Sequence, residues 1–248
     1  MPQRPATSDQ RPDTGAVIVA AGRSRRMDGI DKLWAPLTGP DGGRRPLLAY
    51  SLATFQACTA VHRIALVASD ETLERAQALV RDEGFDNVCA VVPGGASRQD
   101  SVLAGLDALG ACTWVAIHDA ARPLVTIDHI EQGLTEARGT GAACCALPVP
   151  DTVKESDDSG RIVRTLERSR MWLAQTPQVF RYDLLLKAHR QAEGFGLSLS
   201  PKAEATDDAA LVEALGVTVR LYPGSPRNLK VTTKEDLALV EALLAQPS

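Results

Sequence analysis

Basic residues follow directly after the first apolar segment of the chain. The segment Ala16–Ala21 (AVIVAA) runs into Gly22 and then into RSRRM, in which Arg26 is the last arginine, and Lys32 lies a few residues further on. A glycine lets the backbone approach a ligand closely, and free N–H groups in such a loop can hold phosphate oxygens. The segment has neither the G-x-G-x-x-G pattern of dinucleotide-binding loops nor a G-K-S/T sequence. It therefore predicts a polyphosphate site of another kind, with a solvated basic loop as the alternative.

An aspartate ends the fourth apolar segment, Trp114–His118, in the sequence HDAARP. Asp119 at the tip of a buried strand is well placed to hold Mg²⁺ on a polyphosphate. Alternatively, its side chain caps the following turn or pairs with Arg122. Phosphoryl transfer needs a cation that bridges phosphate oxygens, so the nearby basic loop favours the metal role. Neighbouring strand residues face opposite sides, so His118 and Asp119 are not expected to form a catalytic pair.

Two glycines and a serine follow the third apolar segment, Asn87–Val92, in the sequence PGGASRQDS. Ser97 is a plausible helix N-cap, and Gly94-Gly95 before it predicts a tight turn with exposed backbone groups. Such a turn could read the edge of a base, with Ser101 facing the same pocket one helical turn later. The alternative is a strand-to-helix connection that binds nothing.

These segments belong to an alternation of strands and helices through the first 150 residues. The predicted strands are Ala16–Ala21, Ile64–Ser69, Asn87–Val92, Trp114–His118 and Ala142–Val149, and the predicted crossover helices include 72–83, 97–109 and 127–138. Alternation of this kind predicts an α/β fold, a Rossmann-like, doubly wound, mainly parallel sheet, and the near-continuous apolar strands predict burial on both faces. Open sheets of this kind bind ligands at the carboxyl ends of their strands, which is where all three segments lie.

The alternation of predicted strands and helices stops at Asp151. Residues 151–168 carry two short polar runs around the turn signal SDDSG, which predicts a β-hairpin. A hairpin of two polar strands is only marginally stable in water, so we expect this arm to contact a surface outside its own domain. We expect residues 1–14 to be a disordered tail and residues 15–248 to form one domain. Its later part should contain helices over 183–193 and 206–215, a strand over 217–222 and a final helix that opens on a Thr232/Glu235 capping box.

Composition limits the function classes. The 248 residues hold 27 Lys and Arg against 31 Asp and Glu, a formal net charge of -4, which argues against a broad nucleic-acid surface. The five cysteines show no CxxC pair or zinc spacing, which fits a reducing compartment, and we expect Cys89, Cys144 and Cys145 to be buried in strands. No apolar stretch approaches the roughly 20 residues of a membrane helix, and the first residues, MPQRPATSDQRPDTG, lack the apolar region of a signal peptide. We therefore predict a cytoplasmic protein that does not enter a membrane.

Taken together, the motifs resemble the 2-C-methyl-D-erythritol 4-phosphate cytidylyltransferase family over residues 15–245. AAGRSRRM with Lys32, GGASRQDSVLAGL, HDAARP, PDTVK, TPQVF, TDDA and NLKVT occur in the order that the family has them. HDAARP and R-x-D-S-V-x-x-G are fairly specific, whereas A-A-G-x-x-x-R-M is shared with many nucleotidyltransferases. The chain departs from the pattern at Ser24, where glycine is usual, at Asp31, where proline is common, and in the longer connection PDGGRR.

The resemblance implies a nucleotidyltransferase-type fold and an enzyme that transfers CMP from CTP to 2-C-methyl-D-erythritol 4-phosphate, releasing pyrophosphate. It implies Mg²⁺ as cofactor, with Asp119 as its ligand, and a homodimer with interlocking hairpin arms. Arg26 and Lys32 would stabilise the α-phosphate. The implied nucleotide-binding residues are Ala20, Ala21, Gly22, Gly94, Gly95, Ser101 and Ala120. The implied acceptor-binding residues are Arg122, Thr152, Arg168, Thr206 and Lys230, some of them from the arm of a second subunit.

Three alternatives remain at this stage. The first is the same transfer to another alditol phosphate such as ribitol 5-phosphate, since that related family differs mainly in the acceptor pocket. The second is an NAD-dependent oxidoreductase, which would share the sheet but should have the glycine fingerprint that this chain lacks. The third is a non-catalytic nucleotide-binding module, which would have no need of Arg26, Lys32 and Asp119 together.

Overall fold

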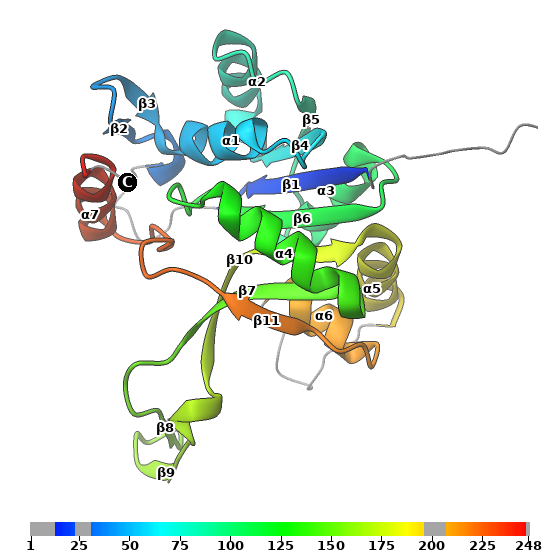
Figure 1. Cartoon of the computed structure of the whole chain (residues 1–248), viewed down its shortest axis with the longest axis vertical. Helices are drawn as coiled ribbons and strands as arrows, with labels where there is room; N and C mark the ends of the chain where they lie inside the picture. The colour runs from blue at the N-terminus through cyan, green and yellow to red at the C-terminus, as the bar shows by residue number, and fades with distance from the viewer. Residues whose placement is uncertain (1–12, 23–30, 196–206, 247–248) are drawn as a thin grey trace, which may run out of the picture.

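A seven-stranded sheet forms the centre of the molecule in the computed structural model, which describes residues 13–22, 31–195 and 207–246. Its strand order is β11-β7-β10-β6-β1-β4-β5 (Figure 1). The strands are β1 (Thr14–Ala20), β4 (Arg63–Ala68), β5 (Val88–Pro93), β6 (Trp114–Asp119), β7 (Ala142–Pro148), β10 (Trp172–Arg181) and β11 (Arg220–Pro223). All neighbours pair in parallel except β10, which runs antiparallel to both β6 and β7. The predicted mainly parallel α/β class is confirmed.

Helices cover both faces of this sheet. The helices of the described ranges are α1 (Leu47–Ala57), α2 (Leu73–Asp82), α3 (Arg98–Leu109), α4 (Ile127–Thr140), α5 (Tyr182–Phe195), α6 (Asp208–Ala214) and α7 (Lys234–Leu244), with short 3-10 turns η1 (Lys32–Trp34), η2 (Asp70–Thr72) and η3 (Arg168–Arg170). One face packs against α1 and α4, which Figure 1 shows in front of the sheet, and the other against α3, α5 and α6. None of these helices has the length and hydrophobicity to span a lipid bilayer.

Strand alternation divides the core between these two faces. In β1, Ala16 and Ile18 pack with the α1 and α4 side, whereas Val17 packs with the α3 and α5 side. The same rule applies at the end of β6, so His118 and Asp119 point to opposite faces. His118 lies against the Phe55 ring of α1, with 5.1 Å between ring centroids. The predicted separation of this pair is confirmed.

Several elements differ from the sequence-based expectation. The helix α1, the small antiparallel pair β2 (Pro36–Thr38) and β3 (Arg44–Pro46), and the long strand β10 were not predicted. The strand β1 begins at Thr14, inside the expected tail, and β11 begins at Arg220, later than expected. The final helix is capped by Thr233 with Asp236 and not by Thr232 with Glu235, because the Asp236 carboxylate accepts the N–H groups of both threonines.

The predicted arm is present. Strands β8 (Lys154–Ser156) and β9 (Ile162–Thr165) form a hairpin that projects from the body of the molecule (Figure 1). Its turn is held by Asp157, whose carboxylate accepts the N–H groups of Ser159 and Arg161, and by Gly160, whose φ of 80° favours glycine. All residues of the two strands are exposed, so the described chain gives the arm no packing partner of its own.

The cysteine prediction is partly wrong. Cys144 and Cys145 are buried in β7, as expected, but Cys89 is exposed. The strand β5 is the last strand of the sheet order, so it is an edge strand with a half-covered surface.

Candidate active site

Asp119 lies at the carboxyl tip of β6 between two cations. Its Oδ1 atom is 3.3 Å from Nε of Arg98, and its Oδ2 atom is 2.7 Å from Nζ of Lys230. Burial raises the pKa of the Asp119 carboxyl, but the charges of Arg98 and Lys230 outweigh this and hold the pKa well below its usual range. The carboxylate is therefore ionised at neutral pH. Of the alternatives predicted for this side chain, pairing with Arg122 is not found; Arg122 is bonded to Asp119 through its main-chain N–H.

The segment 228–231 contains the predicted acceptor residue Lys230 and is hydrogen-bonded to a second one, Arg122. The N–H of Val231 donates to the carbonyl of Ala121 over 2.8 Å, which ties this segment to the turn after β6. The Nη1 atom of Arg122 donates to the carbonyl of Asn228 over 2.7 Å. The Nε atom of Arg122 is buried without a hydrogen-bond partner. Because an unpaired buried N–H is costly, this guanidinium is suited to an additional acceptor such as a phosphate oxygen.

The opposite face of the β6 tip is held by a neutral histidine. Nε2 of His118 lies 3.2 Å from the carbonyl of Arg122, so this nitrogen carries the proton and Nδ1 accepts from the Thr176 hydroxyl over 3.0 Å. The same hydroxyl accepts the main-chain N–H of Asp119 over 3.1 Å. Burial lowers the pKa of His118 to about 3. The ring therefore acts as a neutral support for the backbone that carries Asp119.

The glycine turn after β5 packs tightly against the end of β1. A Cβ atom added at Gly94 would lie 2.4 Å from the Ala21 side chain and 2.8 Å from the Ser101 hydroxyl, so only glycine fits there without displacing them. The N–H of Gly95 donates to the same hydroxyl over 3.2 Å. Ser97 caps α3 as predicted, in a capping box with Asp100. The structure thus brings Ala21, Gly94, Gly95 and Ser101 together, with Ala20 and Gly22 beside them in the chain.

Ala120, the residue after Asp119, is hydrogen-bonded to the strand β1, which leads into the loop beside the glycine turn. Its N–H donates to the carbonyl of Val19 in the neighbouring strand β1, and its carbonyl accepts the hydroxyl of Ser51 from α1. The predicted nucleotide-binding and metal-binding groups therefore share one edge of the sheet.

The basic loop is described only from Asp31 onward, so Arg26 lies outside the described residues. Lys32 is the first residue of the 3-10 turn η1, and the Asp31 carboxylate caps this turn by accepting the N–H of Leu33 over 3.1 Å. Asp31 therefore has a local structural role, which answers why a carboxylate precedes this lysine. Trp34, at the end of the turn, is buried, with the Arg75 guanidinium 4.2 Å from its ring centroid.

A cavity of about 240 Å³ surrounds Asp119. Its lining includes the predicted residues Asp119, Arg122 and Lys230, and it also includes residues that were not predicted: Arg98, Ala174, Gln175, Thr176, Gln178 and Asp207. Lys32, Thr152 and Arg168 do not line it, and Thr206 lies outside the described residues. Arg168 donates instead to the carbonyl of Pro150 at the base of the arm, over 2.8 Å.

The unpredicted lining residues come from three segments: the strand β10, the start of α3 and the residue before α6. The register between β10 and β7 shifts between Ala174 and Gln178, and this irregularity presents Gln175 and Thr176 to the cavity. Arg98 lies in the motif GGASRQDS, which the sequence analysis identified, but nothing in the sequence indicates that its side chain reaches β6. Asp207 lies in the TDDA motif beside the predicted Thr206.

In the ranges that the structure describes, no three His, Cys, Asp or Glu side chains gather as a metal site. Mg²⁺ is commonly held by one or two carboxylates together with substrate phosphates and water. An ionised Asp119 at the rim of a cationic cavity fits that mode of binding.

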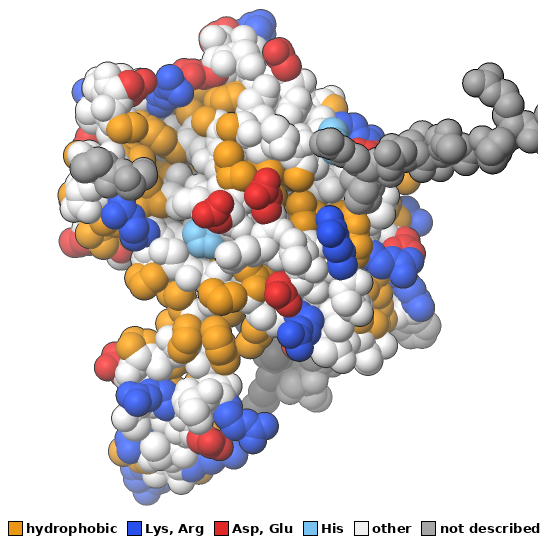
Figure 2. Space-filling model, in the orientation of Figure 1, with side chains coloured by type: hydrophobic (Ala, Val, Ile, Leu, Met, Phe, Trp, Pro, Cys, Tyr) orange, Lys and Arg blue, Asp and Glu red, His pale blue; other side chains and the backbone are white. Residues whose placement is uncertain are grey.

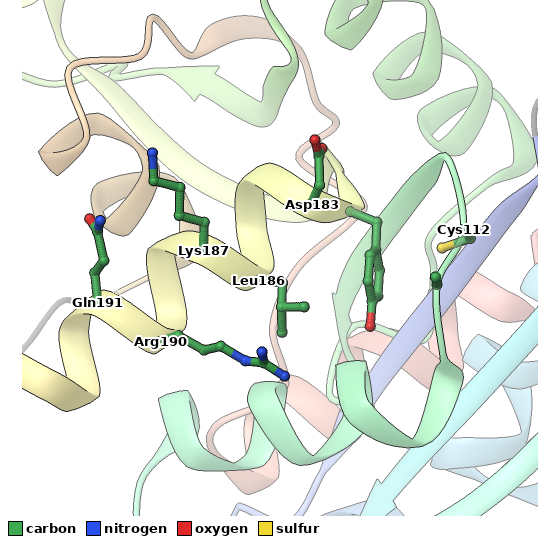
Figure 3. Close-up of a pocket in the computed structure, with 8 residues that line it drawn as sticks. Cys112, Asp183, Leu186, Lys187, Arg190 and Gln191 are labelled. Carbon is green, nitrogen blue, oxygen red and sulfur yellow. The ribbon is translucent and has the colours of Figure 1, made fainter.

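A second and larger groove, of about 610 Å³, lies at the other end of β6. Figure 3 shows its side chains, which come mainly from α5 and from the loop around Cys112 that leads into β6. Burial raises the pKa of the Cys112 thiol to about 11, so it is not a nucleophile at neutral pH. None of the predicted site residues lines this groove, whereas Asp119, Arg122 and Lys230 line the smaller cavity, so the Asp119 cavity is the candidate active site.

Comparisons with known proteins agree on one family. Residues 14–246 match the family model described as 2-C-methyl-D-erythritol 4-phosphate cytidylyltransferase. A protein of that name from Dehalococcoides mccartyi (strain CBDB1) is 46% identical over 93% of this chain and 95% of its own length, and one from Bacillus licheniformis is 41% identical over 92% and 94%. The crystal structure of the Thermus thermophilus enzyme of the same name superposes with a TM-score of 0.72 at 33% identity, covering 92% of this chain and 96% of that one.

Proposed function

This chain belongs to the family of 2-C-methyl-D-erythritol 4-phosphate cytidylyltransferases, and we propose that Asp119 is the centre of its active site. The enzyme transfers CMP from CTP to 2-C-methyl-D-erythritol 4-phosphate, giving 4-diphosphocytidyl-2-C-methyl-D-erythritol and pyrophosphate. The acceptor phosphate and the α-phosphate of CTP must meet at one point. The observation that carries the proposal is the grouping of Asp119, Arg98, Arg122 and Lys230 around one cavity.

The chemistry requires cations more than it requires a base. An oxygen of the acceptor phosphate forms a bond to the α-phosphorus of CTP, and the bond between that phosphorus and the bridging oxygen to the β-phosphate breaks, with the electron pair leaving on pyrophosphate. The attacking oxygen is already ionised, so the barrier lies in bringing two anions together. Lys32 and Arg26 are the proposed partners of the α-phosphate, and Arg122 and Lys230 those of the acceptor phosphate.

We propose Mg²⁺ as the cofactor and Asp119 as its protein ligand. Bound Mg²⁺ would neutralise charge on the CTP phosphates. The ionised state of Asp119 supports this role. Lys230, whose side chain is 42% exposed, is the partner of Asp119 with room to move toward a substrate oxygen.

We also propose a homodimer formed through the arm. Thr152 and Arg168, which the family resemblance assigns to acceptor binding, do not line the cavity of their own chain. Ile162 and Val163 at the arm tip are 64% and 61% exposed, and Trp172 and Leu173 at its base are also exposed. Figure 2 shows hydrophobic side chains gathered where the arm joins the body, with Lys and Arg side chains on the arm. A second copy would cover this surface and receive the arm residues at its own cavity.

The cytoplasm is the compartment we propose. All five cysteines are unpaired, as is usual for proteins in a reducing environment.

A pyrophosphate-release assay with the purified protein, CTP and Mg²⁺ tests this proposal. We expect turnover with 2-C-methyl-D-erythritol 4-phosphate and little with ribitol 5-phosphate. Asp119→Asn keeps the shape of the side chain but removes its charge, and we expect kcat to fall at least about 100-fold. Near-normal turnover of this variant would remove Asp119 from the centre of the mechanism.

A further inference from the structure

A buried carboxylate and a buried histidine lie behind the cavity, between α5 and α6. Asp208 is fully buried and His189 is 2% exposed, and Oδ1 of Asp208 is 2.9 Å from Nε2 of His189. Burying a carboxylate is costly unless hydrogen bonds and opposite charge compensate it. A core position that needed only packing would be filled more favourably by an apolar side chain, so this pair calls for another explanation.

The same carboxylate reaches the active site through Arg98. Oδ2 of Asp208 accepts from Nη1 of Arg98 over 2.7 Å, and Nε of that guanidinium lies 3.3 Å from Oδ1 of Asp119. One planar group thus contacts the buried carboxylate with one nitrogen and the active-site carboxylate with another. The charges and hydrogen bonds of Arg98 and His189 outweigh burial and lower the pKa of Asp208, which is therefore ionised.

The helix α3 by itself does not favour a cation at the position of Arg98. Arg98 is the first residue of α3, where the helix dipole opposes a positive charge. The two carboxylates are therefore what hold the guanidinium in place, and its rigid planar geometry transfers the orientation of one carboxylate to the other. Loss of the bond at Asp208 would leave Arg98 free to turn, and Asp119 would lose its fixed partner at Oδ1.

We propose that His189 and Asp208 are positioning residues for nucleotidyl transfer, acting through Arg98 on the carboxylate of Asp119. The proposal rests on the role proposed above for Asp119. Neither residue touches substrate. His189 fixes Asp208, Asp208 fixes the guanidinium, and the guanidinium fixes the direction in which Asp119 presents its oxygens. Displacements of about 1 Å at a reacting group can reduce the rate by as much as about 100-fold, so such a chain has kinetic consequences.

The test compares variants that keep or remove each link. Asp208→Asn keeps the shape and removes the charge, and His189→Leu removes the donor. His189→Gln keeps an N–H close to the position of Nε2. We expect kcat to fall about 10-fold in Asp208→Asn and His189→Leu and to stay within about twofold of normal in His189→Gln, with a small change in the KM for CTP. The binding of Mn²⁺ in the presence of CTP, followed by electron paramagnetic resonance, should weaken in parallel with kcat.

A matched control is His129→Leu. His129 is also buried and hydrogen-bonded, but its partner is Thr126 at the start of α4. This variant should lose stability with unchanged kcat and Mn²⁺ binding. Arg98→Lys provides a further test if the substitutions at Asp208 or His189 prevent folding, because the Arg98 side chain is 27% exposed. A single ammonium group cannot contact both carboxylates. Arg98→Lys should show the same loss of kcat as Asp208→Asn.

The outcomes separate this inference from the proposed function. If Asp208→Asn lowers kcat in the wild-type background but not in Asp119→Asn, the two residues act on one step, as proposed. Loss of activity in Asp119→Asn with normal kcat in Asp208→Asn, His189→Leu and Arg98→Lys would overturn the positioning chain and leave the active site standing. Equal losses in His189→Gln and His189→Leu would likewise refute it, and normal turnover in Asp119→Asn would remove both proposals.

Discussion

The neutral histidine behind Asp119 makes the stability of the fold depend on pH. In the folded state the pKa of His118 is lowered by burial to about 3, whereas the ordinary value is 6.5. Protonation would also place a hydrogen on Nδ1, which now accepts from the Thr176 hydroxyl. A group with a depressed folded pKa contributes stability that is complete above its unfolded pKa and is lost as the pH falls toward the folded value. The stability that neutral His118 contributes is therefore lost as the pH falls from about 6.5 to about 3.

The expected loss follows from linkage. At about pH 5 the unfolded chain binds a proton at His118 and the folded chain does not, so the free energy of unfolding falls by about 2 kcal/mol relative to neutral pH. Asp119 and Asp208 add nothing to this interval, because their ordinary value of 3.8 lies below it and their folded pKa values are lower still. Urea unfolding between about pH 7.5 and about pH 5 measures the change.

His118→Asn isolates the effect, because it keeps a polar group beside Thr176 and does not titrate. The burial of His129 also lowers its pKa and adds to the slope of the wild-type protein, but it does so equally in the variant. We expect the variant to be less stable at neutral pH and to lose about 2 kcal/mol less than the wild type on acidification. Parallel curves for the two proteins would refute the assignment of His118 as a buried neutral group.

Three further predictions concern the nucleotide turn, the arm and the basic loop. Gly94→Ala should raise the KM for CTP about 10-fold and lower stability by about 1 to 3 kcal/mol, because its Cβ would meet Ala21 at 2.4 Å. Gly139→Ala, at an exposed position of α4 where a Cβ meets nothing within 4 Å, should instead add up to about 1 kcal/mol of stability with unchanged KM. If the proposed homodimer forms through the arm, replacement of Ile162 and Val163 by serine should give a monomer in sedimentation, with a stability within about 0.5 kcal/mol of that of the unchanged fold; a dimer that persists in this variant would exclude the arm tip as the dimer interface. Lys32→Ala should lower kcat about 100-fold in the pyrophosphate-release assay, and a change in KM alone would limit this lysine to binding.

Residues at strand ends were the part of the candidate site that the sequence could indicate. The tip of a buried strand is visible as a change from apolar to polar residues, and parallel strands bring such tips to one edge. Asp119 and Gly94 were predicted as candidate site residues in this way, Ser101 was predicted from its place one helical turn after the glycine turn, and Arg122 and Lys230 came from the family resemblance. The sheet class was predicted for the same reason, because buried parallel strands have continuous apolar sequences.

The missed elements have weak local signals. The strand β10 contains Gln175, Thr176 and Gln178 in place of an apolar run, because its middle part faces the cavity, and these polar residues hide its strand character in the sequence. Asp208 and His189 are separated by 19 residues and Arg98 lies 110 residues from Asp208, so no spacing pattern connects them. A charged residue in a helical segment is normally interpreted as a surface residue, and only the packing of α3, α5 and α6 on one face shows otherwise.

The single antiparallel strand explains why the arm and the active site belong together. The strand β7 ends at Pro148, and β10 begins at Trp172 and returns antiparallel beside it, so the connection between them leaves the sheet at the carboxyl edge of β7. The tip of β6, next to β10, lies at that same edge. A parallel connection would have needed a crossover helix and would have delivered its loop to the opposite edge. The reversal therefore places both ends of the arm beside the Asp119 cavity, while the arm itself extends away from the body (Figure 1). Shortening the arm to a tight turn between Pro148 and Trp172 should accordingly preserve the fold and abolish transfer to the acceptor, whereas binding of CTP should persist.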